Sequence, residues 1–181
     1  MSALFLADFD FASQPNQETP LTPIFAAPEI LDVSSPLYRT STYAGDIFSL
    51  GATLLYIFTG QAFNSVVLNC ANSSESIRFA NGETLGWKRV YEENFNDAFT
   101  KASRSVPTPL ASVIRNTLLP SNQKRPKATE LEEQLKAAAS ELENGSFLPP
   151  EPSNFSEDPI GMRQPILDVF VELKYDLREI S

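Results

Sequence analysis

The sequence contains no histidine and only one cysteine, Cys70, among its 181 residues. These absences exclude imidazole acid–base chemistry, internal disulfides and zinc sites built from Cys and His ligands. A lone thiol is typical of proteins from a reducing compartment, so we expect a cytoplasmic protein.

Basic residues are also scarce, because 14 Lys and Arg face 23 Asp and Glu and leave a formal net charge of −9. Such a surface repels phosphate backbones and anionic headgroups, so we expect no nucleic-acid partner and no membrane surface partner. Long apolar runs are missing as well: the apolar residues 1–7 meet Asp8 too soon for a signal peptide or a membrane span. The 42% hydrophobic content is nevertheless enough for a folded core.

The residues that are present predict a mainly α-helical fold. Residues 42–59 are apolar on nearly every face and are followed by Gly60, which predicts a helix enclosed on all sides with a glycine C-cap. Helical spacing of apolar residues predicts three more helices, and Pro28 predicts the start of a short one. The three further ranges are 87–102, 109–119 and 128–143.

The chain divides into three parts. Residues 1–145 are the expected folded domain, and the alternation around Phe9–Phe11 predicts a short strand near its start. Residues 146–160 hold four prolines and are expected to form a linker. Residues 161–181 are expected to form an additional amphipathic helix. Its apolar stripe includes Ile166, Phe170, Leu173 and Leu177, with Val169 and Ile180 beside them.

Four short motifs follow one another along the domain. They are ADFDFA at residues 7–12, TPIFAAPE at 22–29, DIFSLG at 46–51 and KRPKATEL at 124–131. Each has an ordinary interpretation on its own: an alternating strand, a proline-opened helix, a helix with an acidic first turn and a solvated basic turn. Taken in this order, over about residues 4–142, they resemble the C-terminal lobe of a serine/threonine protein kinase, from its metal-binding segment to its last helix.

The resemblance implies roles for residues near the start of the chain. Asp8 matches the aspartate that binds magnesium beside the nucleotide phosphates. Asp10 stands where the family has a glycine, so this segment has less backbone freedom and an additional negative charge. Thr22 lies in the part that resembles the substrate-binding loop.

The same resemblance implies an internal ion pair and an anchored helix. Glu29 is expected to pair with Arg125, because arginine offers a planar fork to a buried carboxylate. Asp46 matches the aspartate that holds the catalytic-loop backbone in the family. A charge buried at the start of an apolar helix needs such a partner.

Other family parts are not found in the 181 residues. The glycine-rich loop, the strand lysine and the catalytic loop precede the metal-binding segment in the family, whereas only seven residues precede Asp8 here. No GxGxxG or HRD-like string occurs. We therefore expect a pseudokinase-like chain with no complete catalytic site. We expect no cofactor for the chain alone, and Mg-ATP only if another chain supplies the nucleotide lobe.

Three hypotheses remain open for the function. Without the preceding family segments, one side of the helix at 42–59 loses its cover, and an uncovered apolar surface binds something. The chain is a non-catalytic interaction or regulatory module that uses this surface and its last helix for a protein partner or for self-association. Alternatively, it is half of a serine/threonine protein kinase that is completed by another chain and phosphorylates proteins with ATP. The third hypothesis is that the chain is the product of a truncated kinase gene.

Overall fold

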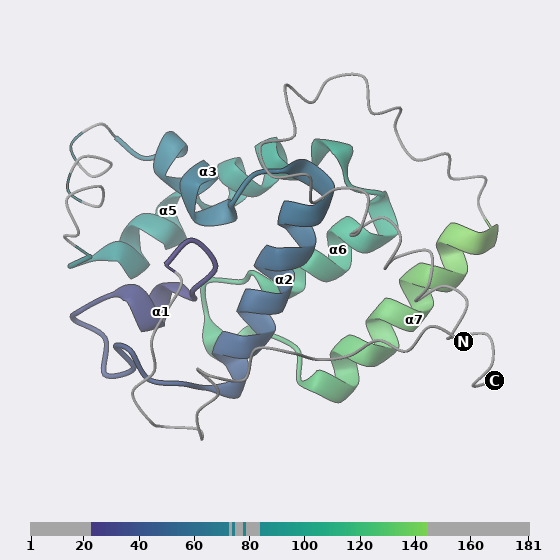
Figure 1. The fold of residues 1–181 in the computed structure, drawn as a ribbon, viewed down its shortest axis with the longest axis horizontal. Helices are drawn as coiled ribbons and strands as arrows, with labels where there is room; N and C mark the ends of the chain where they lie inside the picture. The colour runs from purple at the N-terminus through teal and green to yellow at the C-terminus, as the bar shows by residue number, and fades with distance from the viewer. Residues whose placement is uncertain (1–22, 73, 75–77, 79–83, 145–181) are drawn as a thin grey trace. The chain divides into compact units, whose positions relative to one another are not determined.

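The computed structural model describes residues 23–72, 74, 78 and 84–144, shown in colour in Figure 1. These residues form six α-helices and no strand, so the described part of the chain is mainly α, as the sequence predicts. The expected strand near Phe9–Phe11 and the expected helix at 161–181 lie outside the described residues, as do Asp8, Asp10 and Thr22.

The helices follow one another with two short 3-10 turns between them. They are α1 (Pro28–Leu31), α2 (Tyr43–Thr59), α3 (Phe63–Cys70), α5 (Trp87–Ala102), α6 (Thr108–Thr117) and α7 (Ala128–Asn144), and the turns are Ser103–Ser105 and Asn122–Lys124. The predicted helices at 42–59, 87–102, 109–119 and 128–143 are confirmed as α2, α5, α6 and α7, with ends that differ by at most two residues. Helix α3 is the one that sequence patterns did not predict.

Helix α2 begins and ends where its sequence predicts. The Thr42 hydroxyl accepts a hydrogen bond from the Gly45 backbone N–H at 2.9 Å, which caps the first turn. At the other end Gly60 has a φ of 67°, in the left-handed region that glycine adopts without steric cost. Its N–H donates to the Tyr56 carbonyl at 2.7 Å and satisfies a carbonyl in the last turn.

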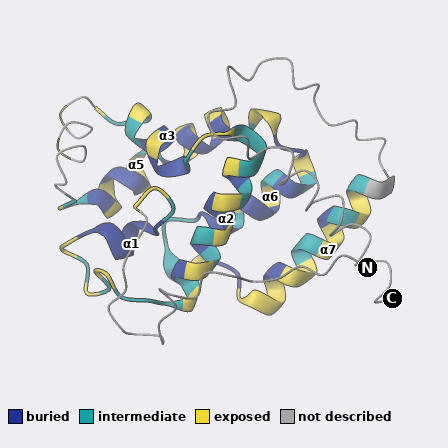
Figure 2. Ribbon diagram, viewed as in Figure 1, coloured by how far each residue is buried: buried dark blue, intermediate teal, exposed yellow. Residues whose placement is uncertain are grey.

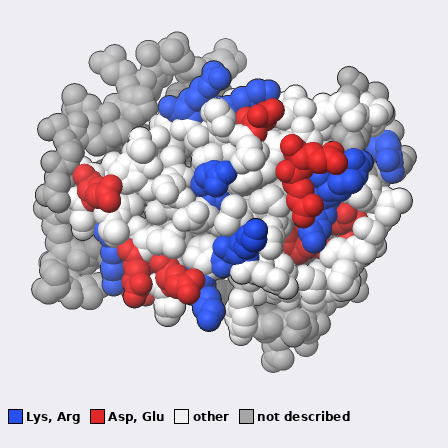
Figure 3. All heavy atoms as spheres, turned by 180° about the vertical axis from the view of Figure 1, so that it is seen from behind, with Lys and Arg blue, Asp and Glu red and all other residues white. Residues whose placement is uncertain are grey.

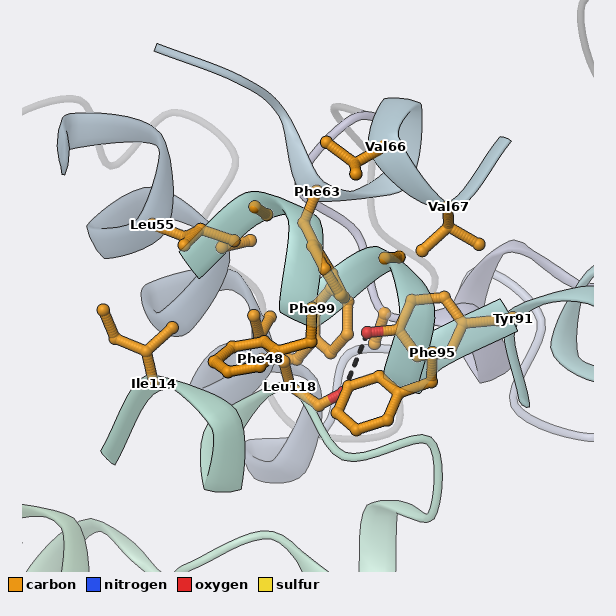
Figure 4. Close-up of a cluster of buried hydrophobic side chains, with 14 of the residues drawn as sticks. Phe48, Leu55, Phe63, Val66, Val67, Tyr91, Phe95, Phe99, Ile114 and Leu118 are labelled. Atoms are coloured by element: carbon orange, nitrogen blue, oxygen red, sulfur yellow. Dashed lines mark hydrogen bonds between the residues drawn. The ribbon is translucent and has the colours of Figure 1, made fainter. Parts of the chain in front are cut away.

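Aromatic side chains form the centre of the core (Figure 4). The Phe63 ring of α3 packs edge-on against Tyr91 and Phe95 of α5, with centroid separations of 5.8 and 6.0 Å. The buried Tyr91 hydroxyl donates a hydrogen bond to the Leu118 carbonyl at 2.8 Å, the dashed line in Figure 4. Phe48 of α2 lies on the same cluster, so the core joins α2, α3, α5 and the residues after α6.

A glycine lets α2 and α6 approach closely. A methyl group at Gly51 would overlap the hydroxyl of Thr117 and lie 2.7 Å from the Thr117 Cβ. A side chain at position 51 would therefore push the two helices apart, which ties the glycine in the DIFSLG motif to the packing of α6.

The expectation that α2 is enclosed on every side is wrong. Its inner face is fully buried, with Phe48, Ala52 and Leu55 inaccessible to solvent. Its outer face is not, since Tyr43 is 75% exposed and Leu50 is 43% exposed. Figure 2 shows exposed and half-buried residues along the length of α2. One face of α2 thus packs in the core, and the opposite face exposes apolar side chains to solvent.

Candidate interaction surface and the ion pair behind it

The predicted pair of Glu29 and Arg125 is present. Arg125 Nη1 lies 2.6 Å from Glu29 Oε1, and Nη2 lies 2.8 Å from Oε2, so the guanidinium binds both carboxylate oxygens. The two residues are 96 positions apart in the chain, and their side chains are 0% (Arg125) and 4% (Glu29) exposed. A bidentate geometry of this kind is the strongest form that such a pair takes.

Arg125 also connects the elements around the pair. Its Nη1 donates to the Ala44 carbonyl in the first turn of α2 at 2.9 Å, and its Nε donates to the Leu119 carbonyl at 2.8 Å. The guanidinium lies over the Phe48 ring, 4.9 Å from its centroid. A single side chain thus joins α1, the start of α2 and the segment after α6, and its charge is compensated within the buried site.

Two polar side chains hold the segment that enters α1. Asn64 of α3 donates from Nδ2 to the carbonyls of Pro23 at 2.9 Å and Ala26 at 3.0 Å. The Ser49 hydroxyl of α2 donates to the Phe25 carbonyl at 3.0 Å. Sequence reasoning missed both residues, because an Asn in a polar stretch and a Ser in an apolar helix are common and carry no distinguishing pattern. Together they keep the TPIFAAPE segment in place from residue 23 onward.

A buried carboxylate that sequence reasoning also missed caps α5. Asp32 accepts hydrogen bonds from the backbone N–H groups of Lys88 at 2.9 Å and Gly86 at 3.2 Å. It also accepts bonds from the Ser34 N–H at 2.9 Å and the Ser34 hydroxyl at 2.6 Å. Burial alone raises the pKa of Asp32, but the bonds from Ser34, Lys88 and Gly86 outweigh it and hold the pKa below the ordinary 3.8. Because the capped helix starts more than 50 residues later, no local pattern predicts this contact.

The outward side of α2 carries a continuous row of residues, which we call the α2 stripe: Tyr43, Asp46, Leu50, Thr53 and Ile57. The first four are exposed and Ile57 is half-buried. They follow one another in steps of three and four residues, so they lie in line along one face of the helix. Three of the five are apolar or aromatic. The stripe is thus a narrow, mostly apolar ridge on a helix whose opposite face is fixed in the core.

Asp46 lies within this stripe and is not a member of the buried ion pair. The sequence predicts a buried carboxylate with a partner, whereas the structure places Asp46 on an exposed face with no side-chain hydrogen bond to any described residue. Partial shielding by its neighbours raises the pKa of the Asp46 carboxyl above the ordinary 3.8. Asp46 also lies in the first turn of α2, where the helix dipole favours a negative charge.

The face of the molecule seen in Figure 3 has no patch of one charge. In Figure 3, which shows the molecule from behind, Lys and Arg alternate with Asp and Glu and do not gather in one patch. The described residues contain no group of three or more Cys, Asp or Glu side chains placed to hold a metal ion. None of the described helices alone is long and apolar enough to cross a membrane; α2 and α3 meet that criterion only as a pair bent by 82°.

The structure therefore brings Glu29 and Arg125 together, whereas Asp46 takes no part in their ion pair. The remaining candidate residues, Asp8, Asp10 and Thr22 and the stripe of Ile166, Phe170, Leu173 and Leu177, lie outside the described residues. No family model, no curated protein and no solved structure matches the chain. The contacts described above are thus the basis on which a function is proposed.

Proposed function

We propose that this protein is a non-catalytic interaction module built on a helical subdomain like the C-terminal lobe of a protein kinase, and that it binds an amphipathic protein helix through the α2 stripe. The observation that carries the proposal is the stripe itself. Tyr43, Leu50 and Ile57 are apolar or aromatic residues in line on a helix whose other side is immobilised in the core. A ridge of this kind packs between the side chains of a second helix.

The kinase-like part of the proposal is supported by the meeting of three motifs in space. Glu29 comes from TPIFAAPE, Phe48 from DIFSLG and Arg125 from KRPKATEL, and Arg125 contacts both of the others. Motifs that are far apart in the chain, in the order that the family resemblance implies, thus form one buried cluster. This convergence agrees with the order and the pairing that the resemblance implies.

The non-catalytic part of the proposal is supported by the residue content. The 181 residues include no histidine, so they contain no HRD-like string, and they include no GxGxxG. Phosphoryl transfer depends on positioning and on charge neutralisation by several such groups together. Calorimetric titration of Mg-ATP into the purified full chain is expected to give no binding heat. Micromolar affinity that Asp8→Ala abolishes would instead favour an enzyme.

A site-specific photocrosslinker tests the interaction. The full chain carries p-benzoylphenylalanine at Leu50 in one sample and, as the control, at Glu93, an exposed position on α5. After irradiation in an extract of the source cells, mass spectrometry identifies the crosslinked peptide. We expect a single amphipathic peptide attached at position 50 and not at position 93. Equal labelling at both positions, or no labelled peptide at position 50, would contradict an interaction surface on α2.

One observation favours the alternative, half of a serine/threonine kinase completed by another chain. Asp46 matches the aspartate that holds the catalytic-loop backbone in the family, and here its partly shielded carboxyl has no side-chain partner among the described residues. A catalytic loop supplied by a second chain would provide that partner. Under this alternative, the peptide crosslinked at position 50 belongs to a polypeptide with an HRD-like string, and the mixture transfers phosphate from Mg-ATP to a protein such as casein.

A further inference from the structure

The single charge of the α2 stripe lies inside its apolar row. Asp46 follows Tyr43 by three residues and precedes Leu50 by four, so it stands about one turn from each on the same face. Helix α2 contains no other charged residue. A second helix that packs along Tyr43, Leu50 and Ile57 therefore covers the Asp46 carboxylate as well.

The described part of the chain does not compensate this charge. The Asp46 carboxylate makes no hydrogen bond or ion pair with any described residue. Shielding by its neighbours raises the pKa of the Asp46 carboxyl above the ordinary 3.8. Arg125 reaches the first turn of α2 at the Ala44 carbonyl, but its guanidinium already binds both carboxylate oxygens of Glu29. Asp46 is thus a partly shielded carboxylate without a counter-charge among the described residues.

Covering this carboxylate with apolar atoms is unfavourable. A carboxylate that loses its hydration without gaining a partner destabilises a complex by more than a neighbouring apolar contact stabilises it. A cation placed against it offsets that loss, and close charge pairs at protein interfaces are strongly coupled. An occupant of the α2 stripe therefore has to bring a positive charge to this place. Arginine suits it best, because the planar guanidinium binds both carboxylate oxygens.

We infer that the partner helix carries an arginine or lysine that pairs with Asp46, about one turn from the partner residue opposite Leu50. The inference rests on the proposed function and adds the chemistry of the partner, an amphipathic helix with one cation in its apolar row. The formal net charge of −9 on the chain agrees with a basic partner, because opposite charges speed association.

The same carboxylate selects against other occupants. A helix with an acidic residue at this place repels Asp46, and a helix with only apolar residues leaves it unpaired. Helix α2 contains no lysine or arginine. Pairing of the α2 stripe with the α2 stripe of a second molecule therefore covers two carboxylates and brings no cation from either helix.

The probe for the test is the peptide that crosslinks to p-benzoylphenylalanine at position 50. It is synthesised, and isothermal titration calorimetry measures its affinity for the full-length wild type, for Asp46→Asn and for Asp97→Asn. The last variant is the matched control, because it removes the same charge from an exposed position on α5. Circular dichroism and melting temperature check that each protein is folded.

We expect the peptide to contain an arginine or lysine three or four residues from its crosslinked position. Asp46→Asn is expected to raise the Kd about tenfold or more, since the cation of the partner is left unpaired in the interface. Asp97→Asn should change the Kd by less than about twofold, because distant exposed charges are screened by salt. Equal Kd values for the two variants, or a peptide without a basic residue at this spacing, would overturn the inference.

A charge exchange tests for direct pairing. Asp46→Arg should weaken binding of the natural peptide more than Asp46→Asn does. A peptide with glutamate in place of its basic residue should bind the wild type weakly and the Asp46→Arg protein more tightly. A general loss of stability in the Asp46→Arg protein does not produce this rescue, because it weakens the binding of both peptides.

The outcomes separate this inference from the proposed function. If no peptide crosslinks at position 50, both are wrong. If a peptide crosslinks there and binds Asp46→Asn as tightly as the wild type, the interaction surface stands and the inferred cation is wrong. If Asp46→Asn weakens binding but the charge exchange does not restore it, neutral donors such as backbone N–H groups bind Asp46, and the inferred cation is again wrong.

Discussion

The Glu29 carboxylate and the Arg125 guanidinium bind each other through two hydrogen bonds of 2.6 and 2.8 Å across 96 residues of chain. Arg125 stacks on Phe48 and binds the Ala44 carbonyl in the same position. The buried pair therefore connects α1 to the first turn of α2.

Arg125→Met is expected to destabilise the folded chain by about 3–5 kcal/mol, because Glu29 is left buried without compensation. Urea unfolding followed by circular dichroism measures the loss. The double variant Glu29→Leu/Arg125→Met should lose less than Arg125→Met alone, since no unpaired charge remains. Arg104→Met, at an exposed arginine, is the control and should change stability by less than about 0.5 kcal/mol. If the Arg125 and Arg104 variants lose the same free energy of unfolding, the ion pair does not stabilise the folded chain.

Asp32 is expected to make the free energy of unfolding fall as the pH is lowered into the acid range. Because its folded pKa is held below the ordinary 3.8, Asp32 stabilises the folded state above that pH, and this contribution is lost as pH falls through the folded pKa. Asp32→Asn should therefore lower stability at pH 7 and flatten the decline of stability below about pH 4. Urea unfolding at a series of pH values measures both effects. A parallel acid decline in the wild type and the variant would contradict the role of this carboxylate.

Gly51→Ala is expected to destabilise the chain by about 1–3 kcal/mol, although alanine favours a helix, because the new methyl group overlaps Thr117. Gly45→Ala is the control on the same helix. There the added methyl group meets the tip of the Ile30 side chain and lies 3.1 Å from the Thr42 hydroxyl, and both side chains can shift, so we expect a smaller loss than at Gly51. Thermal melting of both variants is the measurement. The packing argument fails if Gly51→Ala proves as stable as Gly45→Ala.

The sequence by itself determined which segments are helical. Apolar spacing located α2, α5, α6 and α7, Pro28 marked the start of α1, and Gly60 marked the end of α2, because each signal is local and acts within one or two turns. The order of motifs also led to Glu29 and Arg125. Helix α3 escaped prediction because it begins a stretch rich in Asn, Ser and Gly, and packing against α5 decides its conformation.

Only the tertiary structure decided which side of α2 is exposed. The helix is apolar on nearly all faces, so its periodicity carries no information about which side faces the core. Contacts with Thr117 across α6 and with Phe63 and Tyr91 through the core bury the side of Gly51 and Phe48 and leave Tyr43 and Leu50 outside. The cap that Asp32 provides to α5 is decided in the same way, by a hydrogen bond across more than 50 residues. Long-range contacts of this kind depend on the whole packed arrangement, which no local pattern of residues encodes.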